Sequence, residues 1–207
     1  DVEAKALDDY VKALVPLVNR PVLWVGWSLG GLAVLRLAEL HPQRVASALL
    51  VATNPCFVTQ KDWSSAVDEK VFDQFASDLK LDQKKTIRRF LALQVKGLPD
   101  AMSVVRQLQN SMESRGQAST AALQTGLNIL LETDLRSNIG HIESPLYWML
   151  GARDTLVPAE LAKTLTAKYQ QDAVTLCENA SHAPFISQRD EFIKQLLVIA
   201  EKIRGAR

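Results

Sequence analysis

Cysteine and histidine are scarce in this chain, whose 207 residues contain two cysteines and three histidines. Cys56 and Cys177 lie far apart, form no C-x-x-C pair and have no histidine cluster beside them. Protein zinc sites draw on such closely spaced ligands, so we expect no metal. Two isolated thiols are typical of a reduced cytoplasmic protein, and one long-range disulfide between them is the alternative.

Long apolar runs and a strong net charge are also lacking. No stretch approaches the roughly 20 apolar residues that span a bilayer, and the chain opens with the polar helix-type segment DVEAK, so we expect no membrane segment and no signal peptide. The formal net charge of +1 excludes the strongly basic composition of a general nucleic-acid binder. What remains is the ordinary mixture of a globular domain.

Positive charge is nevertheless concentrated in one part of the chain. Seven Lys or Arg and only two Asp fall between Lys80 and Arg106, while the remainder is mildly acidic. An acidic partner should therefore meet this segment. The alternative is that the run of charges is only a solvated face, which is its usual role.

Short apolar runs near both ends of the chain predict strands buried on both faces of a parallel sheet, because they do not alternate with polar residues. Segments of helical periodicity separate them. This alternation indicates an α/β fold with helices on both faces of the sheet. The expected strands are residues 22–25, 45–52, 146–150 and 174–177, and the expected helices are residues 7–17, 29–40, 159–168 and 191–203.

The middle of the chain differs, because it shows helical periodicity and no convincing strand. We therefore expect a core formed by residues 1–56 and 145–207, with residues 57–144 as a helical lid insertion over the carboxyl ends of the strands. The apolar stripes of this insertion are Ile87, Phe90, Leu91 and Val95, then Val104, Val105 and Leu108, and then Leu123, Leu127, Leu130 and Leu131.

The segment GWSLG at residues 26–30 fits the G-x-S-x-G nucleophile elbow, in which a serine occupies a sharp turn between a strand and a helix. The pattern is weak by itself, but an expected strand precedes Ser28 and an expected helix follows it. We interpret the flanking glycines as positions where a Cβ would clash. The free N–H groups of the following helix would face developing negative charge. The alternative is a serine that merely caps the helix.

A serine nucleophile needs a base, and His182 is the best placed of the three histidines. It lies in NASHAPF at residues 179–185, directly after the last expected strand. His41 precedes a proline at a helix end, and His141 lies in a polar segment, so both are expected at the surface.

The base in turn needs an acid to orient it, and Asp154 follows the expected strand at residues 146–150. Asp134 falls in the helical insertion, and Asp172 precedes a strand instead of following one. The order Ser28, Asp154, His182 is the triad order of the α/β-hydrolase fold. The alternative for Asp154 is a turn-forming aspartate.

These motifs resemble the α/β-hydrolase superfamily and, more narrowly, the pimeloyl-[acyl-carrier protein] methyl ester carboxylesterase family of biotin synthesis. The likeness runs over nearly the whole chain, although the elbow alone is shared by many hydrolases. Its most specific pieces are GWSLGGL at residues 26–32, FLALQ at 90–94, TDLR at 133–136 and HAPFIS at 182–187.

The resemblance implies hydrolysis of a methyl ester at the far end of a pimeloyl chain carried on acyl-carrier protein, without a cofactor. It implies a triad of Ser28, Asp154 and His182, with the backbone N–H of Leu29 as an oxyanion donor. The substrate would also contact the lid stretch Phe90, Leu91, Ala92, Leu93 and Gln94. The alternative for this stretch is that it only buries a lid helix against the core.

Acyl-carrier protein is small and strongly acidic, so the resemblance gives the basic segment a partner. We expect a monomer in the cytoplasm that docks this carrier and binds neither nucleic acid nor membrane. The docking side chains would be Lys85, Arg88, Arg89 and Arg106, with Lys84 and Lys96 beside them.

One departure from the superfamily concerns the oxyanion hole. In the superfamily the elbow follows several strands, and an early loop with a His-Gly motif supplies the second oxyanion N–H. Here the elbow serine is residue 28, and no His-Gly dipeptide occurs. We expect that about a third of the core precedes Asp1 outside this chain, which would remove one oxyanion donor at a cost of about 10²–10³ in kcat. The chain alone is then expected to be inactive and unstable, and the full-length protein active.

Two other functions remain open at this stage. A general short-chain carboxylesterase would keep the triad and change only the substrate. A non-catalytic binding module would keep the hydrolase fold without turnover.

Overall fold

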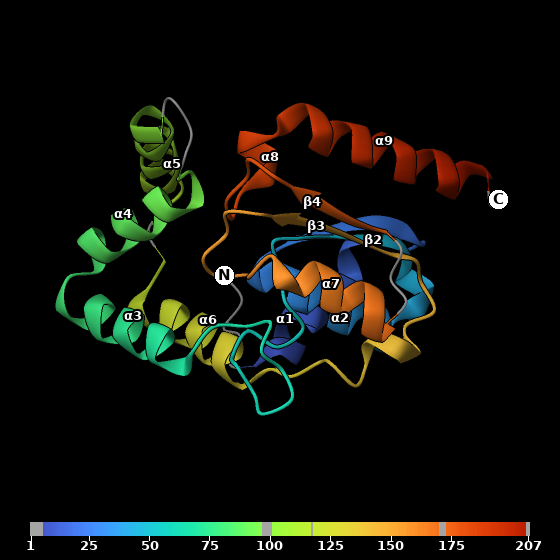
Figure 1. Ribbon diagram of the computed structural model, residues 1–207, viewed down its shortest axis with the longest axis horizontal. Helices are drawn as coiled ribbons and strands as arrows, with labels where there is room; N and C mark the ends of the chain where they lie inside the picture. Colours follow the sequence, from blue (N-terminus) through green and yellow to red (C-terminus); the bar gives the residue numbers. More distant parts are fainter. Residues whose placement is uncertain (1–5, 97–100, 117, 170–172, 206–207) are drawn as a thin grey trace.

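The computed structural model describes residues 6–96, 101–116, 118–169 and 173–205 (Figure 1). Its strands form one parallel sheet in the order β1-β2-β3-β4. Their bounds are Val22–Trp27 for β1, Val45–Val51 for β2, Leu146–Gly151 for β3 and Val174–Cys177 for β4. The four strands expected from the sequence are therefore present, with ends that differ by two residues at most. Only β2 and β3 are buried as expected, because β1 and β4 are the outer strands of the described sheet.

The register of the sheet brings the carboxyl ends of the strands to one edge. Trp27 lies opposite Val51, Val51 lies opposite Met149, and Gly151 lies opposite Cys177. A residue that directly follows one strand is therefore a neighbour of residues that follow the next. This alignment places three loops side by side.

Helices cover both faces of the sheet, as the alternation of strands and helices predicts (Figure 1). One buried cluster contains Leu32, Leu50 and Trp148, and the cluster on the opposite face contains Leu49 and Met149. Successive residues of a strand thus serve opposite faces. The first face carries α1 (Leu7–Leu14), α2 (Leu29–Leu40) and α7 (Glu160–Tyr169), and the second carries α8 (Pro184–Ser187) and α9 (Arg189–Gly205).

Four α-helices of the described residues lie between β2 and β3 in the sequence and form a group beside the sheet (Figure 1). Three of them begin after a side chain that accepts a hydrogen bond from the first turn: Asp68, Asp82 and Ser119. Their bounds are Glu69–Leu81 for α3, Gln83–Gln94 for α4, Ala101–Arg115 for α5 and Thr120–Glu132 for α6. We call α3–α6 the insertion helices.

The structure corrects the expected first helix, which extended to residue 17. The α-helix ends at Leu14, a 3-10 turn covers Val15–Leu17, and the Leu17 side chain is 69% exposed. Pro16 explains this, because it has no N–H to donate and its ring clashes with a preceding carbonyl group. Leu17 is therefore not part of the buried apolar stripe.

No helix within the described ranges combines the length and hydrophobicity required to traverse a bilayer. Both cysteines are buried and carry free thiols, so the structure contains no disulfide between Cys56 and Cys177. Burial raises the pKa of the Cys177 thiol to about 11 and also raises the pKa of Cys56.

These thiols should alkylate slowly in the native protein. At pH 8 a thiol with a pKa of about 11 is a thiolate in roughly one molecule in a thousand, so Cys177 should react with iodoacetamide at least about a hundredfold more slowly than in urea. Mass spectrometry of the native and urea-unfolded protein, both without reductant, measures this. Resistance to alkylation in urea until a reductant is added would instead reveal a disulfide.

Candidate active site

Ser28 occupies the turn between β1 and α2 with φ 52° and ψ −123°. A non-glycine residue with positive φ is uncommon and costs roughly 1–3 kcal/mol of backbone strain. Although Ser28 stands at the N-cap position of α2, its side chain makes no capping hydrogen bond to that helix. The serine is therefore not an ordinary helix cap, and its hydroxyl is directed elsewhere.

The glycines of the elbow do not all serve the same purpose. A Cβ on Gly26 would lie 2.6 Å from the Cα of Gly31 and 2.7 Å from the carbonyl oxygen of Gly30, so the steric interpretation is right for Gly26. A Cβ on Gly30 would meet nothing within 4 Å, so the interpretation is wrong there. The second crowded position is Gly31, just outside the motif, where a Cβ would come within 2.6 Å of the Thr53 side chain.

His182 lies in the loop after β4 and reaches the hydroxyl of Ser28. Its Nε2 is 2.8 Å from Ser28 Oγ, and its Nδ1 is 2.7 Å from Asp154 Oδ2. A carboxylate only accepts hydrogen bonds, so Nδ1 carries the proton and Nε2 is free to accept one from the serine. The side chains of His182 and Asp154 are only 2% and 1% exposed.

Asp154 follows β3, and its two carboxylate oxygens accept hydrogen bonds from different groups. Oδ1 accepts from the backbone N–H groups of Leu156 and Val157, at 2.8 and 3.1 Å. Oδ2 faces His182. Asp154 thus makes both the turn contacts and the contact with His182, and its role as the orienting acid stays a prediction.

Trp27 connects the elbow to the loop of His182. Its Nε1 donates to the carbonyl oxygen of His182 at 2.7 Å, and the ring of Phe185 packs edge-on against its ring, with centroids 5.2 Å apart. The residue before the serine thus fixes the backbone of the histidine.

Ser181 connects the same loop to its two neighbours. Its hydroxyl lies 3.2 Å from the carbonyl oxygen of Lys96, just after α4, and 3.3 Å from that of Arg153. The end of α4 therefore lies beside the residue that precedes His182. This contact places the insertion helices at the carboxyl edge of the sheet.

The other histidines and aspartates lie apart from this cluster. His41 follows α2 and is half-buried, whereas His141 is exposed in a 3-10 turn. Asp134 pairs with Arg136 at 2.7 Å, and this guanidinium lowers the pKa of Asp134. Asp172 lies outside the described residues.

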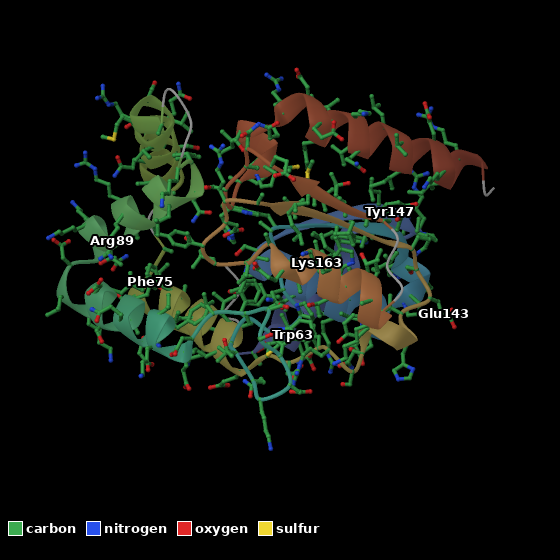
Figure 2. The ribbon with its side chains drawn as sticks, in the orientation of Figure 1. Trp63, Phe75, Arg89, Glu143, Tyr147 and Lys163 are labelled. Carbon is green, nitrogen blue, oxygen red and sulfur yellow. The ribbon has the colours of Figure 1, made fainter. Side chains whose placement is uncertain are left out.

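The predicted acyl-binding stretch forms the last part of α4. Leu91 is buried in a cluster with Val95 and Val105, against which Ile186 of α8 packs. The ring centroid of Phe90 lies 5.5 Å from the ring centroid of Phe75 on α3 (Figure 2 labels Phe75). The remaining members are an exposed Ala92, a half-buried Leu93 and a buried Gln94 whose Oε1 has no hydrogen-bond partner among the described residues.

The predicted docking side chains are all exposed on two insertion helices. Arg89 (Figure 2) is bound only loosely, since its Nη1 lies 3.4 Å from Asp78 Oδ2 and its side chain is 74% exposed. On α4 the group comprises Lys84, Lys85, Arg88 and Arg89, with Lys96 just beyond that helix and Arg106 on α5.

No group of three or more His, Cys, Asp or Glu side chains suited to a metal ion occurs in the part of the chain that the structure describes. Ser28, His182 and Asp154 are the residues that define the site.

Sequence reasoning missed Thr53 and the indole of Trp27. Thr53 follows β2, and its Oγ1 donates to the carbonyl oxygen of Ser28 at 2.6 Å. Its position after a strand end was a usable signal, because the other site residues share it. Trp27 stood inside the elbow motif as a residue of any type, so the motif gave no signal for its side chain.

The family described as the alpha/beta hydrolase fold matches residues 4–188. A pimeloyl-[acyl-carrier protein] methyl ester esterase from Xylella fastidiosa strain M12 is 41% identical over 194 residues, which are 92% of this chain and 75% of that protein. The esterase of the same name from Aliivibrio fischeri strain MJ11 is 38% identical over 189 residues, 91% of this chain and 73% of that protein.

The chain belongs to the α/β-hydrolase family, among its pimeloyl-[acyl-carrier protein] methyl ester esterases. Solved α/β-hydrolase structures agree on the fold. An esterase from Exiguobacterium antarcticum superposes with a TM-score of 0.85 at 19% identity, covering 97% of this chain and 76% of its own. A bromoperoxidase from Bacillus anthracis gives 0.82 at 21% identity with the same coverage. At these identities the likeness shows the fold alone.

The two elbow glycines of this α/β-hydrolase give a direct test of the site geometry. Gly26→Ala should lower the free energy of unfolding by about 2 kcal/mol, because its Cβ overlaps backbone atoms that cannot move independently. Gly30→Ala should leave it unchanged or raise it by up to about 1 kcal/mol, since the site is open and alanine favours the helix. Urea denaturation measures both, and equal losses would contradict the geometry.

Proposed function

We propose that this protein is a serine carboxylesterase that hydrolyses the methyl ester of pimeloyl-[acyl-carrier protein] in biotin synthesis, releasing methanol. The supporting observation is the chain of contacts from a half-buried Ser28 through the buried His182 to the buried Asp154, at 2.8 and 2.7 Å. The names of the relatives indicate the substrate.

The first half of the proposed reaction forms an acyl-enzyme. Nε2 of His182 takes the hydroxyl proton of Ser28 while Oγ attacks the ester carbonyl carbon. Asp154 stabilises the resulting imidazolium through Nδ1. The tetrahedral intermediate then collapses, the bond to the methoxy group breaks, and His182 returns its proton to the departing oxygen to give methanol.

The second half regenerates the serine. Water enters where methanol left and gives a proton to His182 as its oxygen attacks the acyl carbon. Collapse of the second intermediate breaks the bond to Oγ, which recovers the proton. The product is a free carboxyl group on the carrier-bound chain.

Negative charge on the substrate oxygen in both intermediates requires N–H donors. Leu29 is the first residue of α2, and the first N–H groups of a helix have no acceptor within the helix. Its backbone N–H is the donor that we assign to the oxyanion. The dipole of α2 adds to this stabilisation.

The acyl chain, in this proposal, contacts Phe90, Leu91, Ala92, Leu93 and Gln94. Support comes from the position of α4, whose end lies beside Ser181 and whose Leu91 shares a cluster with Ile186. The unpartnered Oε1 of Gln94 leaves an acceptor for a polar group of the ligand. Leu91 also buries α4, so this residue serves packing as well as any contact with substrate.

Residues 57–144 form the lid in this proposal, and residues 1–56 and 145–207 form the core. Part of this segment packs with the core, because Phe57, Trp63 and Leu127 of α6 are buried in the same cluster as sheet residues such as Leu50. The end of α4 supports the covering role, because it lies beside Ser181 at the carboxyl edge of the sheet. We also infer a cytoplasmic monomer, which suits two buried free thiols.

Substitutions in the triad test the chemistry. Ser28→Ala should abolish labelling by a fluorophosphonate probe and lower kcat by about 10⁶. Asp154→Asn should lower kcat by about 10⁴, because the histidine loses its orienting partner. The control is Asp134→Asn, an exposed aspartate that should keep kcat within about twofold. Absence of labelling in the full-length protein would support a binding module, and full activity of Asp154→Asn would contradict the assigned acid.

Charge reversal tests the carrier. The double variant Arg89→Glu/Arg106→Glu should raise KM for the carrier-bound ester about tenfold at low salt, with less effect at high salt. Hydrolysis of p-nitrophenyl esters should be spared. Lys163→Glu/Arg204→Glu, on α7 and α9, changes the net charge equally and should leave both KM values unchanged (Figure 2 labels Lys163).

Equal losses on both substrates would contradict docking at these helices. Comparable kcat/KM for the carrier-bound ester and short p-nitrophenyl esters in the parent protein would instead indicate a general carboxylesterase.

A further inference from the structure

The carbonyl oxygen of Ser28 accepts two hydrogen bonds from different parts of the chain. One comes from the backbone N–H of Gly31 at 2.8 Å, within the same turn. The other comes from Oγ1 of Thr53 at 2.6 Å, from the loop that follows β2. Thr53 is completely buried, so water does not compete for its hydroxyl.

This carbonyl shares a peptide group with the assigned oxyanion donor. The C=O of Ser28 and the N–H of Leu29 lie in one planar trans unit and point in opposite directions. A hydrogen bond that fixes the carbonyl therefore fixes the direction of the N–H. It also polarises the peptide group, which makes the N–H a stronger donor.

The backbone around Thr53 is built for this contact. Ala52 has φ 44°, and among the described residues Ser28 is the only other non-glycine residue with a positive φ. The N–H of Ala52 donates to the carbonyl oxygen of Met149 at 2.9 Å. The turn at Ala52 carries the chain off β2 just before Thr53. Gly31 leaves the space that the Thr53 side chain fills, because a Cβ there would lie 2.6 Å from it.

We propose that Thr53 is a positioning residue for the oxyanion donor: its hydroxyl orients and polarises the Ser28–Leu29 peptide so that the Leu29 N–H meets the charge that develops on the substrate. This inference rests on the proposed esterase function. It assigns Thr53 no contact with substrate.

Thr53→Val and Thr53→Ser separate the hydroxyl from the volume of the side chain. Valine keeps the shape and removes the donor, so kcat should fall about tenfold, a fraction of the 10²–10³ that a lost oxyanion donor costs. KM should stay within about twofold. Affinity for a boronic acid inhibitor, which mimics the tetrahedral intermediate, should fall in parallel with kcat. Serine restores the donor and should recover most of both losses.

Ser47→Ala supplies a matched control on the same strand. Ser47 is also buried, and its hydroxyl donates to the carbonyl oxygen of Pro145 at 2.8 Å at the opposite end of β2. Its loss should lower Tm to a similar degree as Thr53→Val while kcat and boronic acid affinity stay unchanged. The pH profile of kcat/KM should keep its shape in all variants, because His182 and Asp154 are untouched.

The inference would be overturned if Thr53→Val kept the kcat and the boronic acid affinity of the unsubstituted protein. It would also be overturned if Thr53→Ser lost as much of both as Thr53→Val. An inactive full-length protein would refute the proposed function instead. In that case the amide resonance of Leu29 decides the inference by NMR. The resonance should shift upfield in Thr53→Val, return in Thr53→Ser and stay in place in Ser47→Ala; an unmoved resonance in Thr53→Val would overturn it.

Discussion

Ser28 is held in its unusual backbone conformation by hydrogen bonds to the neighbouring strand. Its N–H donates to the carbonyl oxygen of Val51 at 2.9 Å, and its own carbonyl accepts from Thr53 at 2.6 Å. The end of β2 and the loop that follows it therefore bind the serine on both sides of its Cα. This constraint directs the side chain away from α2 and towards His182, and every later contact of the site depends on it.

Asp154 and His182, the proposed acid and base, are each held by more than one hydrogen bond. The carboxylate of Asp154 closes its own turn with one oxygen and holds His182 with the other. Trp27 then holds the carbonyl of His182 from the strand that carries the serine. Each member of the cluster is thus bound to a second loop, so the arrangement is set before any ligand binds, which is the condition for electrostatic catalysis.

The sequence predicted the topology of the site better than its details. Apolar runs located the strands, and because the ends of parallel strands meet, the order of Ser28, Asp154 and His182 predicted their convergence. The contacts of Thr53 and Trp27 depend on register and on distances of a few tenths of an ångström, which no pattern reports. Pro16 was a usable signal for the end of α1, whereas no residue signalled the open space at Gly30.

Ser181 has one hydroxyl proton and two carbonyl groups within reach, those of Lys96 and Arg153. A departure of the insertion helices would remove the first acceptor and leave the second in place. Lys96 is exposed, so water could take over its carbonyl. If the proposed lid moves to admit a long acyl chain, the Ser181 hydroxyl therefore keeps a hydrogen-bond acceptor in Arg153, and the residue before His182 stays held in place.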